Sequence, residues 1–209
     1  MLTFGFCSAI LIHTMPSPFI ARDSFARKAR QEGYLARSAY KLKSILERFT
    51  IIRSGNVVLD IGAAPGSWLQ VISEIIGSRG TVIGIDIQPI TFQAKNVITV
   101  QVDAQSPDIH QHIAPYGPYD AITSDAAPKT TGIKIHDQTR SLELAEQALL
   151  LSQDHLRKGG ALVTKLFQSS DTTLLLRHAH KQFRKAVLYK PKASRERSFE
   201  TFLVCMDKK

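Results

Sequence analysis

The chain has 209 residues, 44% of them hydrophobic and 22% charged, which fits one globular domain and excludes a disordered or fibrous protein. Its formal net charge is +9, and the basic excess gathers in two blocks, Arg22–Arg48 and Arg177–Arg197. Two basic blocks around a nearly neutral middle favour a polyanionic partner such as nucleic acid, because clustered Lys and Arg gain affinity by releasing phosphate counterions.

The N-terminal stretch MLTFGFCSAILIH is apolar, but no Lys or Arg precedes its hydrophobic run, which is too short to span a bilayer. We expect translation to begin near Met15, residues 1–21 to form an extension and residues 22–209 to form the domain; a processed organelle-targeting segment is the alternative. Cys7 and Cys205 form neither a disulfide framework nor a metal spacing, which suits a reducing compartment. We therefore expect a cytoplasmic protein that does not associate with membranes.

Helical and strand patterns alternate along the domain. Helical spacing predicts helices at Asp23–Arg48 (broken near Gly33), Ser67–Ile76, Gln138–Arg157 (closed by Lys158, Gly159 and Gly160) and 171–183. Short apolar runs predict strands at 56–61, 80–86, 96–103, 119–125, 160–167, 185–189 and 199–206. This alternation predicts an α/β fold: a doubly wound, mainly parallel sheet in one domain.

Polar residues stand at or near the ends of several apolar strands, where packing does not explain them. They are Asp60, Asp86, Asp103, Asp125 and Lys165. In a doubly wound sheet, ligands bind at the carboxyl ends of the strands, near the switch in strand order. These five residues are therefore predicted to lie along one ligand-binding rim.

The stretch VVLDIGAAPGSW, Val57–Trp68, joins the first strand to a helix through a turn of small residues. A P-loop requires Lys after its last glycine, and none follows Gly62 or Gly66. A dinucleotide turn requires G-x-G-x-x-G, from which Ala64 and Pro65 depart. The sequence of the turn therefore argues against an NTPase and against a nicotinamide oxidoreductase. A purely structural strand–turn–helix, which binds no cofactor, remains an alternative.

A cofactor without a phosphate group to cradle fits this turn better, and S-adenosylmethionine is such a cofactor. The small residues around Gly62 and Gly66 would let the backbone approach its amino acid portion. Asp86 would accept hydrogen bonds from the ribose diol, and Asp103 would accept one from the adenine amino group. These residues form the predicted cofactor site.

Six sequence blocks occur in the order of one family: RSAYKL, LDIGAAPGSW, GIDIQP, TSDAAP, VTKLFQ and SRERSFE. From Ser24 onward the chain resembles the FtsJ/RrmJ family of RNA ribose 2′-O-methyltransferases. The resemblance implies a single Rossmann-like domain whose seven-stranded sheet is mainly parallel with the last strand antiparallel. It implies a Lys-Asp-Lys-Glu tetrad and cofactor contacts. The tetrad residues are Lys41, Asp125, Lys165 and Glu200, and the cofactor contacts are Gly66, Trp68, Asp86, Asp103 and Asp125.

Three positions depart from the family pattern. Ser67 and Ser169 replace glycines that are common there, and both are expected to tune loops. Phe199 stands where arginine is frequent, directly before Glu200, and is expected to alter RNA contacts.

A ribose 2′-hydroxyl is a weak acid and must lose its proton as it attacks the methyl group. Lys165 is the expected base, with Asp125 orienting it and the methyl donor, while Lys41 and Glu200 position the ribose. A free lysine is protonated at neutral pH. The charge of Lys41 would lower the pKa of Lys165, whereas the charges of Asp125 and Glu200 would raise it. The four groups are therefore expected to titrate as a coupled set. The mechanism requires no metal.

The resemblance points to a uridine of large-subunit ribosomal RNA, methylated in the assembled subunit by a monomeric enzyme. A branch of the family that methylates transfer RNA shares the tetrad and is the first alternative. A non-catalytic RNA-binding assembly factor on the same fold is the second, although such a protein would be expected to have lost tetrad or cofactor residues.

Overall fold

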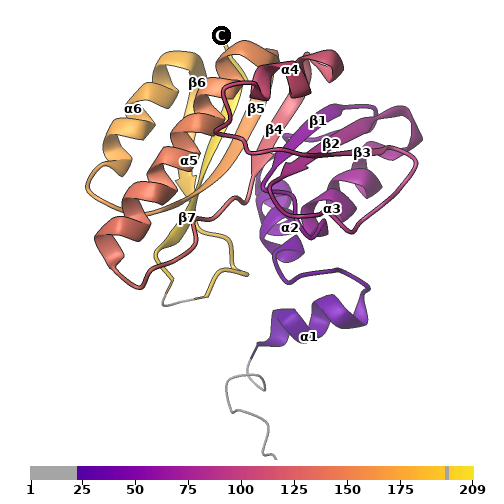
Figure 1. Cartoon of the computed structure of the whole chain (residues 1–209), viewed down its shortest axis with the longest axis horizontal. Coiled ribbons are helices and arrows are strands. Elements are labelled where there is room, and N and C mark those ends of the chain that lie inside the picture. Colours follow the sequence, from indigo (N-terminus) through magenta and orange to yellow (C-terminus); the bar gives the residue numbers. More distant parts are fainter. Residues whose placement is uncertain (1–22, 196–197) are drawn as a thin grey trace, which may run out of the picture.

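The computed structural model describes residues 23–195 and 198–209 (Figure 1). The expected extension at 1–21 and the start near Met15 lie outside this part of the chain. The described helices are α1 (Ser24–Gln31), α2 (Ala39–Arg48), α3 (Ser67–Ile76), α4 (Ile109–Ile113), α5 (Lys134–His155) and α6 (Thr172–Gln182). The described strands are β1 (Val57–Ile61), β2 (Thr81–Asp86), β3 (Val97–Gln101), β4 (Tyr119–Ser124), β5 (Leu156–Phe167), β6 (Phe183–Tyr189) and β7 (Glu200–Lys208).

The strands form one seven-stranded sheet in the order β3-β2-β1-β4-β5-β7-β6. Neighbouring strands from β3 to β5 pair in parallel, whereas β7 is antiparallel to both β5 and β6. The expected mainly parallel sheet with an antiparallel last strand is confirmed. The chain order reverses between β1 and β4, and a crevice at such a switch point is where ligands bind in this architecture.

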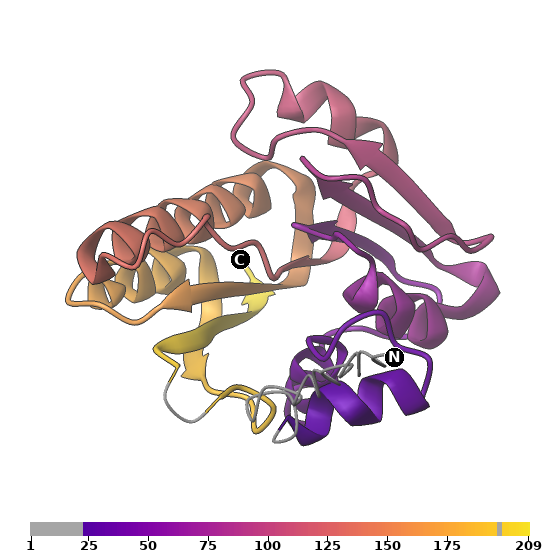
Figure 2. The same ribbon diagram turned by 60° about the horizontal axis from the view of Figure 1, so that its bottom comes forward.

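Helices cover both faces of the sheet, and each face has its own apolar core. Helices α1, α2 and α3 pack on one face, with Leu42, Leu69 and Ile72 fully buried. Helices α4, α5 and α6 pack on the other, around Leu149 and Leu175. Figure 2 shows the two helical layers on opposite sides of the strands. In the described residues, no helix combines the length and apolarity that crossing a membrane requires.

The boundaries differ from the prediction around α5. The helix begins at Lys134, ahead of the predicted Gln138, and it ends at His155. Leu156 is already extended, buried and paired with Tyr119 of β4, so the predicted helix stop at Lys158–Gly160 is wrong: these residues belong to β5. The short helix α4 was not predicted, because five residues are too few to show a helical period.

Candidate active site

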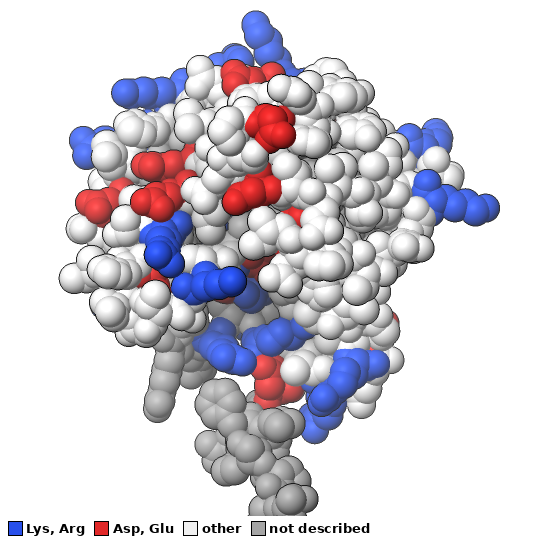
Figure 3. Space-filling view, viewed as in Figure 1, with Lys and Arg blue, Asp and Glu red and all other residues white. Residues whose placement is uncertain are grey.

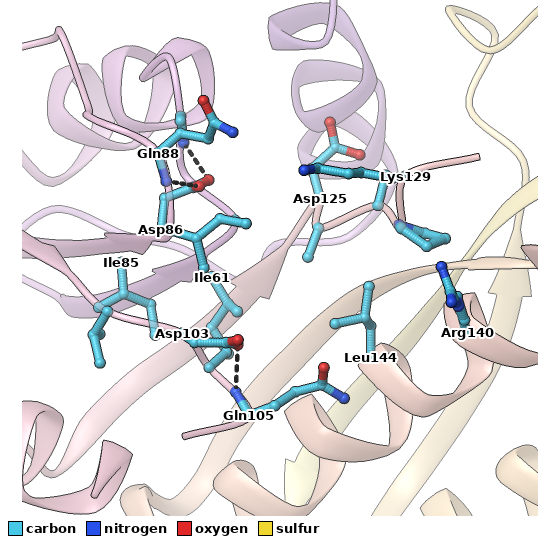
Figure 4. A pocket seen from close by; sticks show the side chains of 18 of the residues that line it. Ile61, Ile85, Asp86, Gln88, Asp103, Gln105, Asp125, Lys129, Arg140 and Leu144 are labelled. Carbon is cyan, nitrogen blue, oxygen red and sulfur yellow. Dashed lines mark hydrogen bonds between the residues drawn. The ribbon is translucent and has the colours of Figure 1, made fainter. Parts of the chain in front are cut away.

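A cleft of about 580 Å³ opens at the carboxyl ends of β1, β2 and β4 (Figure 4). Asp86, Asp103 and Asp125 line it together with Gly62, as the sequence predicted. Its apolar lining includes Ile61, Ile85, Ile87, Val102 and Leu144. Carboxylates beside apolar walls suit a ligand that combines a flat apolar ring with hydroxyl and amino groups.

Glycine is required at both ends of the turn that borders this cleft. Gly62 has a φ of +73°, and a Cβ there would lie 2.6 Å from the Cα of Ala126. Gly66 has a φ of +121°, and its Cβ would lie 2.4 Å from the Cβ of Phe92. Each combines a backbone conformation that side chains rarely adopt with a close neighbour, so the turn keeps its path only with these glycines.

Asp86 ties the turn to the second strand. Its Oδ2 accepts a hydrogen bond from the backbone N–H of Ala64 at 2.9 Å, and its Oδ1 accepts one from that of Gln88 at 2.8 Å. Asp103 Oδ1 accepts one from the N–H of Gln105 at 2.9 Å (Figure 4). A carboxylate has about four lone-pair sites, so both side chains keep acceptor capacity for a ligand after these bonds are made. The acceptors and the apolar walls fit the ribose diol and adenine of an adenosine cofactor.

Trp68 does not present its side chain to the cleft. Its indole is 2% exposed, stacks on Phe202 at a centroid distance of 5.8 Å and donates its Nε1–H to the backbone carbonyl of Ser38 at 2.9 Å. The hydroxyls of Ser67 and Ser38 lie 2.7 Å apart. These bonds fasten α3 to the start of α2, which carries Lys41 one turn later. A cofactor contact of Trp68 stays a prediction for its backbone N–H, in the first turn of α3, where N–H groups have no intrahelical partner.

The four tetrad residues come together as two ion pairs. Lys41 Nζ on α2 lies 2.6 Å from Glu200 Oε2 at the start of β7. Lys165 Nζ on β5 lies 3.0 Å from Asp125 Oδ1, just beyond β4. The hydrogen bond from Lys165 goes to the backbone carbonyl of Asp125, so the contact with Oδ1 is electrostatic attraction rather than a directed hydrogen bond.

The tetrad is largely shielded from water. The side chain of Lys165 is 6% exposed and that of Glu200 is 11% exposed. Burial by itself would raise the pKa of Glu200, but the charges of Lys41 and Lys165 and a hydrogen bond from Ser194 hold it below its ordinary value. Ser194 Oγ donates that bond to Oε1 at 2.8 Å. Glu200 is therefore held as a carboxylate, with both oxygens engaged.

Asp60 differs from Asp86, Asp103 and Asp125, the three predicted rim residues that line the cleft. It is 1% exposed and does not line the cleft. Thr123 donates a hydrogen bond to its Oδ1 at 2.7 Å, while its Oδ2 is buried without a hydrogen-bond partner. Burial, together with the nearby charges of Asp125 and Asp86, raises the pKa of Asp60 to about 8. At neutral pH this carboxyl is mostly protonated.

Sequence reasoning missed several residues that belong to this region. Ser194 supports Glu200, but a serine in a polar loop carries no signal of that role. Arg140 and Glu143 line the cleft from α5, where an amphipathic helix offers many equivalent charged positions.

A sheet of this order with a cleft at its switch point defines the class of Rossmann-like methyltransferases. A crystal structure described as that of a ribosomal RNA methyltransferase from Plasmodium falciparum matches with a TM-score of 0.72 and 28% identity, over 84% of this chain and 98% of that one. The fibrillarin of Aeropyrum pernix, with natively bound S-adenosyl-L-methionine, matches with a TM-score of 0.62 and 18% identity, over 81% of this chain and 76% of that one.

The chain belongs to the FtsJ-like methyltransferase family, whose model matches residues 34–208. The ribosomal RNA large subunit methyltransferase E of Bdellovibrio bacteriovorus is 43% identical over 191 residues, which are 90% of this chain and 97% of the relative. The protein of that name from Syntrophobacter fumaroxidans is 40% identical over 190 residues, 90% and 96% of the two chains. The family, the fold and S-adenosylmethionine as the cofactor are confirmed, and the relatives support action on RNA.

Proposed function

We propose that this protein transfers a methyl group from S-adenosylmethionine to the 2′-hydroxyl of a ribose in large-subunit ribosomal RNA, at a uridine of the assembled subunit. The observation that carries the proposal is the pair of shielded ion pairs, Lys41–Glu200 and Lys165–Asp125, beside a cleft that fits an adenosine cofactor. Asp125 belongs to one of the ion pairs and also to the cleft, because it pairs with Lys165 and lines the cleft. It would therefore stand between the methyl donor and the acceptor.

The cofactor would lie across the switch point of the sheet. Asp86 would accept hydrogen bonds from its ribose diol and Asp103 one from its adenine amino group, and the N-terminal N–H groups of α3 would face its carboxylate. Gly62 and Gly66 maintain the path of the turn, which would receive the amino acid portion. When bound, S-adenosylmethionine supplies an electrophilic methyl group on a sulfonium.

Lys165 would act as the base. Its amine must be unprotonated at the moment of reaction, when it takes the proton of the 2′-hydroxyl as the oxygen bonds to the methyl carbon and the carbon–sulfur bond breaks. Asp125 holds the amine within 3.0 Å of its carboxylate and fixes its direction through the backbone carbonyl. Holding hydroxyl, base and methyl donor in line can supply a large part of the acceleration, since effective molarities for oriented groups reach about 10⁵ M.

Lys41 and Glu200 would position the ribose. Glu200 is fixed by Lys41 on one oxygen and by Ser194 on the other, so its direction is set before substrate arrives. Its remaining lone pairs can accept a hydrogen bond from the ribose. Lys41 offers further N–H donors to an oxygen of the acceptor nucleotide.

The charge of the molecule supports an RNA substrate. Figure 3 shows a hollow near the middle of one face, with Lys and Arg side chains gathered at its lower border. Such an arrangement attracts the phosphate backbone. The names of the relatives favour ribosomal over transfer RNA as the substrate. We also propose that the enzyme acts as a monomer in the cytoplasm.

The test is transfer of a labelled methyl group from S-adenosylmethionine to large ribosomal subunits and, in parallel, to transfer RNA, both from cells that lack this gene. We expect label in the subunits and none with Lys165→Ala. Label in transfer RNA alone would replace the ribosomal substrate. If neither RNA is labelled although the protein binds the cofactor, the proposed enzymatic activity would be contradicted and a non-catalytic assembly factor would be favoured.

A further inference from the structure

Phe199 is the exposed phenylalanine of the described chain, with 57% of its surface open to solvent. It stands directly before Glu200 in the chain, and its side chain lines a hollow beside the start of α5. Its backbone is fixed, because its carbonyl accepts a hydrogen bond from the N–H of Gln168 at 2.9 Å. A large apolar ring is thus held in water one residue before Glu200, which would help to receive the ribose.

A hollow of about 270 Å³ adjoins this ring. It is lined by Gly132, Lys134, Asp137, Gln138, Phe167, Ser198 and Phe199. The ammonium of Lys134 lies 4.3 Å from the centroid of the Phe199 ring, a cation–π contact that limits the directions the ring can take. The carboxylate of Asp137 is directed to the backbone N–H groups of Thr131 and Gly132, at 2.7 and 3.2 Å, so it serves the loop rather than the hollow.

We propose that Phe199 is a stacking platform for a nucleobase of the substrate RNA, at the nucleotide next to the methylated ribose, and that Lys134 contacts the adjoining phosphate. This inference rests on the proposed function. A ribose can reach a partly buried tetrad only from an unpaired or unstacked strand, whose exposed bases gain by stacking on aromatic rings. The exposed ring and its cation offer a partner for each half of a nucleotide, the base and the phosphate.

Position distinguishes Phe199 from the other exposed apolar side chains. Scattered surface hydrophobes are normal and need no explanation. Leu150, for example, is equally exposed at 57%, but it lies on α5 beside a groove formed with α6. Phe199 directly precedes Glu200 of the tetrad in the chain and also lines a hollow.

The experiment compares Phe199→Ala, Phe199→Leu and Phe199→Tyr, with Leu150→Ala as the matched control. The measurements are KM and kcat for methylation of large subunits that lack the modification, and the affinity for S-adenosylmethionine. A second readout needs no turnover: fluorescence quenching of a single-stranded oligoribonucleotide that carries 2-aminopurine next to a uridine. Melting temperatures check that each variant folds.

We expect KM to rise roughly 5- to 150-fold in the Ala and Leu variants, the range for losing one base–aromatic stack. The Tyr variant should keep KM within about twofold of the wild type, because tyrosine presents the same aromatic face. Cofactor affinity should not change in any variant. Quenching should be strong with the wild type and the Tyr variant and weak with Ala and Leu.

An unchanged KM in Phe199→Ala, or a Leu variant as good as Tyr, would overturn the stacking role. Equal quenching by all proteins, or none by the wild type, would also contradict it. Failure of the proposed function looks different: the wild type would then methylate no RNA, whatever residue stands at 199.

Discussion

Asp60 gives the structure a pH-dependent weakness that one substitution should remove. Its raised pKa, about 8 against 3.8 in an unfolded chain, follows first from burial and then from the charges of Asp125 and Asp86. Folding therefore takes up a proton between pH 4 and 8. A group with a raised pKa contributes stability that is complete below its unfolded pKa and lost as the pH rises through its folded pKa. This group accordingly destabilises the fold at neutral and alkaline pH.

Asp60→Asn keeps the shape of the protonated side chain and removes its titration. Its Oδ1 can still accept the hydrogen bond that Thr123 donates at 2.7 Å. Between the unfolded pKa of 3.8 and pH 7, the wild type loses stability over about three pH units. At about 1.36 kcal/mol per unit, the loss that Asp60→Asn can remove has an upper bound of about 4 kcal/mol. We expect a gain of about 2–4 kcal/mol, because the surroundings of a buried charge relax.

The assay is urea unfolding of the cofactor-free protein from pH 4.5 to 8.5, for the wild type, Asp60→Asn and Asp154→Asn. Asp154 is exposed and serves as the control. The gain of Asp60→Asn should grow with pH and level off above about 8. At pH 7 its Tm should rise roughly 4–16 °C, at about 2–4 °C per kcal/mol for a domain of this size. A pH-independent difference, or a less stable variant at pH 8, would refute the reasoning.

Three further substitutions test other parts of the site. Gly62→Ala would place a Cβ 2.6 Å from the Cα of Ala126 at a φ of +73°. We expect the free energy of unfolding in urea to fall by about 2 kcal/mol or more, and cofactor binding to be lost in calorimetry. Normal binding would contradict the role of the turn. Trp68→Phe removes the hydrogen bond to Ser38. We expect the free energy of unfolding in urea to fall by about 1–3 kcal/mol, with cofactor affinity within a few fold of the wild type. A large loss of affinity without a loss of stability would place the indole in the cofactor site. Glu200→Gln breaks a shielded ion pair, so the rate of methyl transfer should fall at least tenfold while cofactor affinity stays unchanged. The dependence of stability on pH should lose the decline at acid pH that the lowered pKa of Glu200 produces. An unchanged rate would show that Glu200 does not belong to the active site.

The strands and long helices could be predicted because their apolar patterns are strict. Val57–Ile61, Thr81–Asp86 and Ser67–Ile76 appear within a residue of the prediction. The start of β5 could not, because Lys158–Gly160 has the composition of a turn and lies at an irregularity between two paired stretches of the strand, at Leu156 and from Ala161 onward. Local sequence is a weak guide wherever tertiary pairing decides.

The identity of the tetrad followed from the resemblance, but its pairing did not. Lys41 and Glu200 are 159 positions apart, and nothing in the sequence shows that they touch each other rather than Asp125 or Lys165. The direction of the Trp68 side chain could have been read from the sequence, because Trp68 shares an apolar stripe with Ile72 at a spacing of four residues.

The most direct test of the central claim is the chemical position of the transferred methyl group. Large subunits labelled by the wild-type protein would be stripped to RNA and hydrolysed in alkali, which cleaves next to a free 2′-hydroxyl. We expect label in alkali-resistant dinucleotides, at a uridine, and none with Lys165→Ala. Label recovered in single nucleotides would mean that a base was methylated, which would contradict the role given to the tetrad.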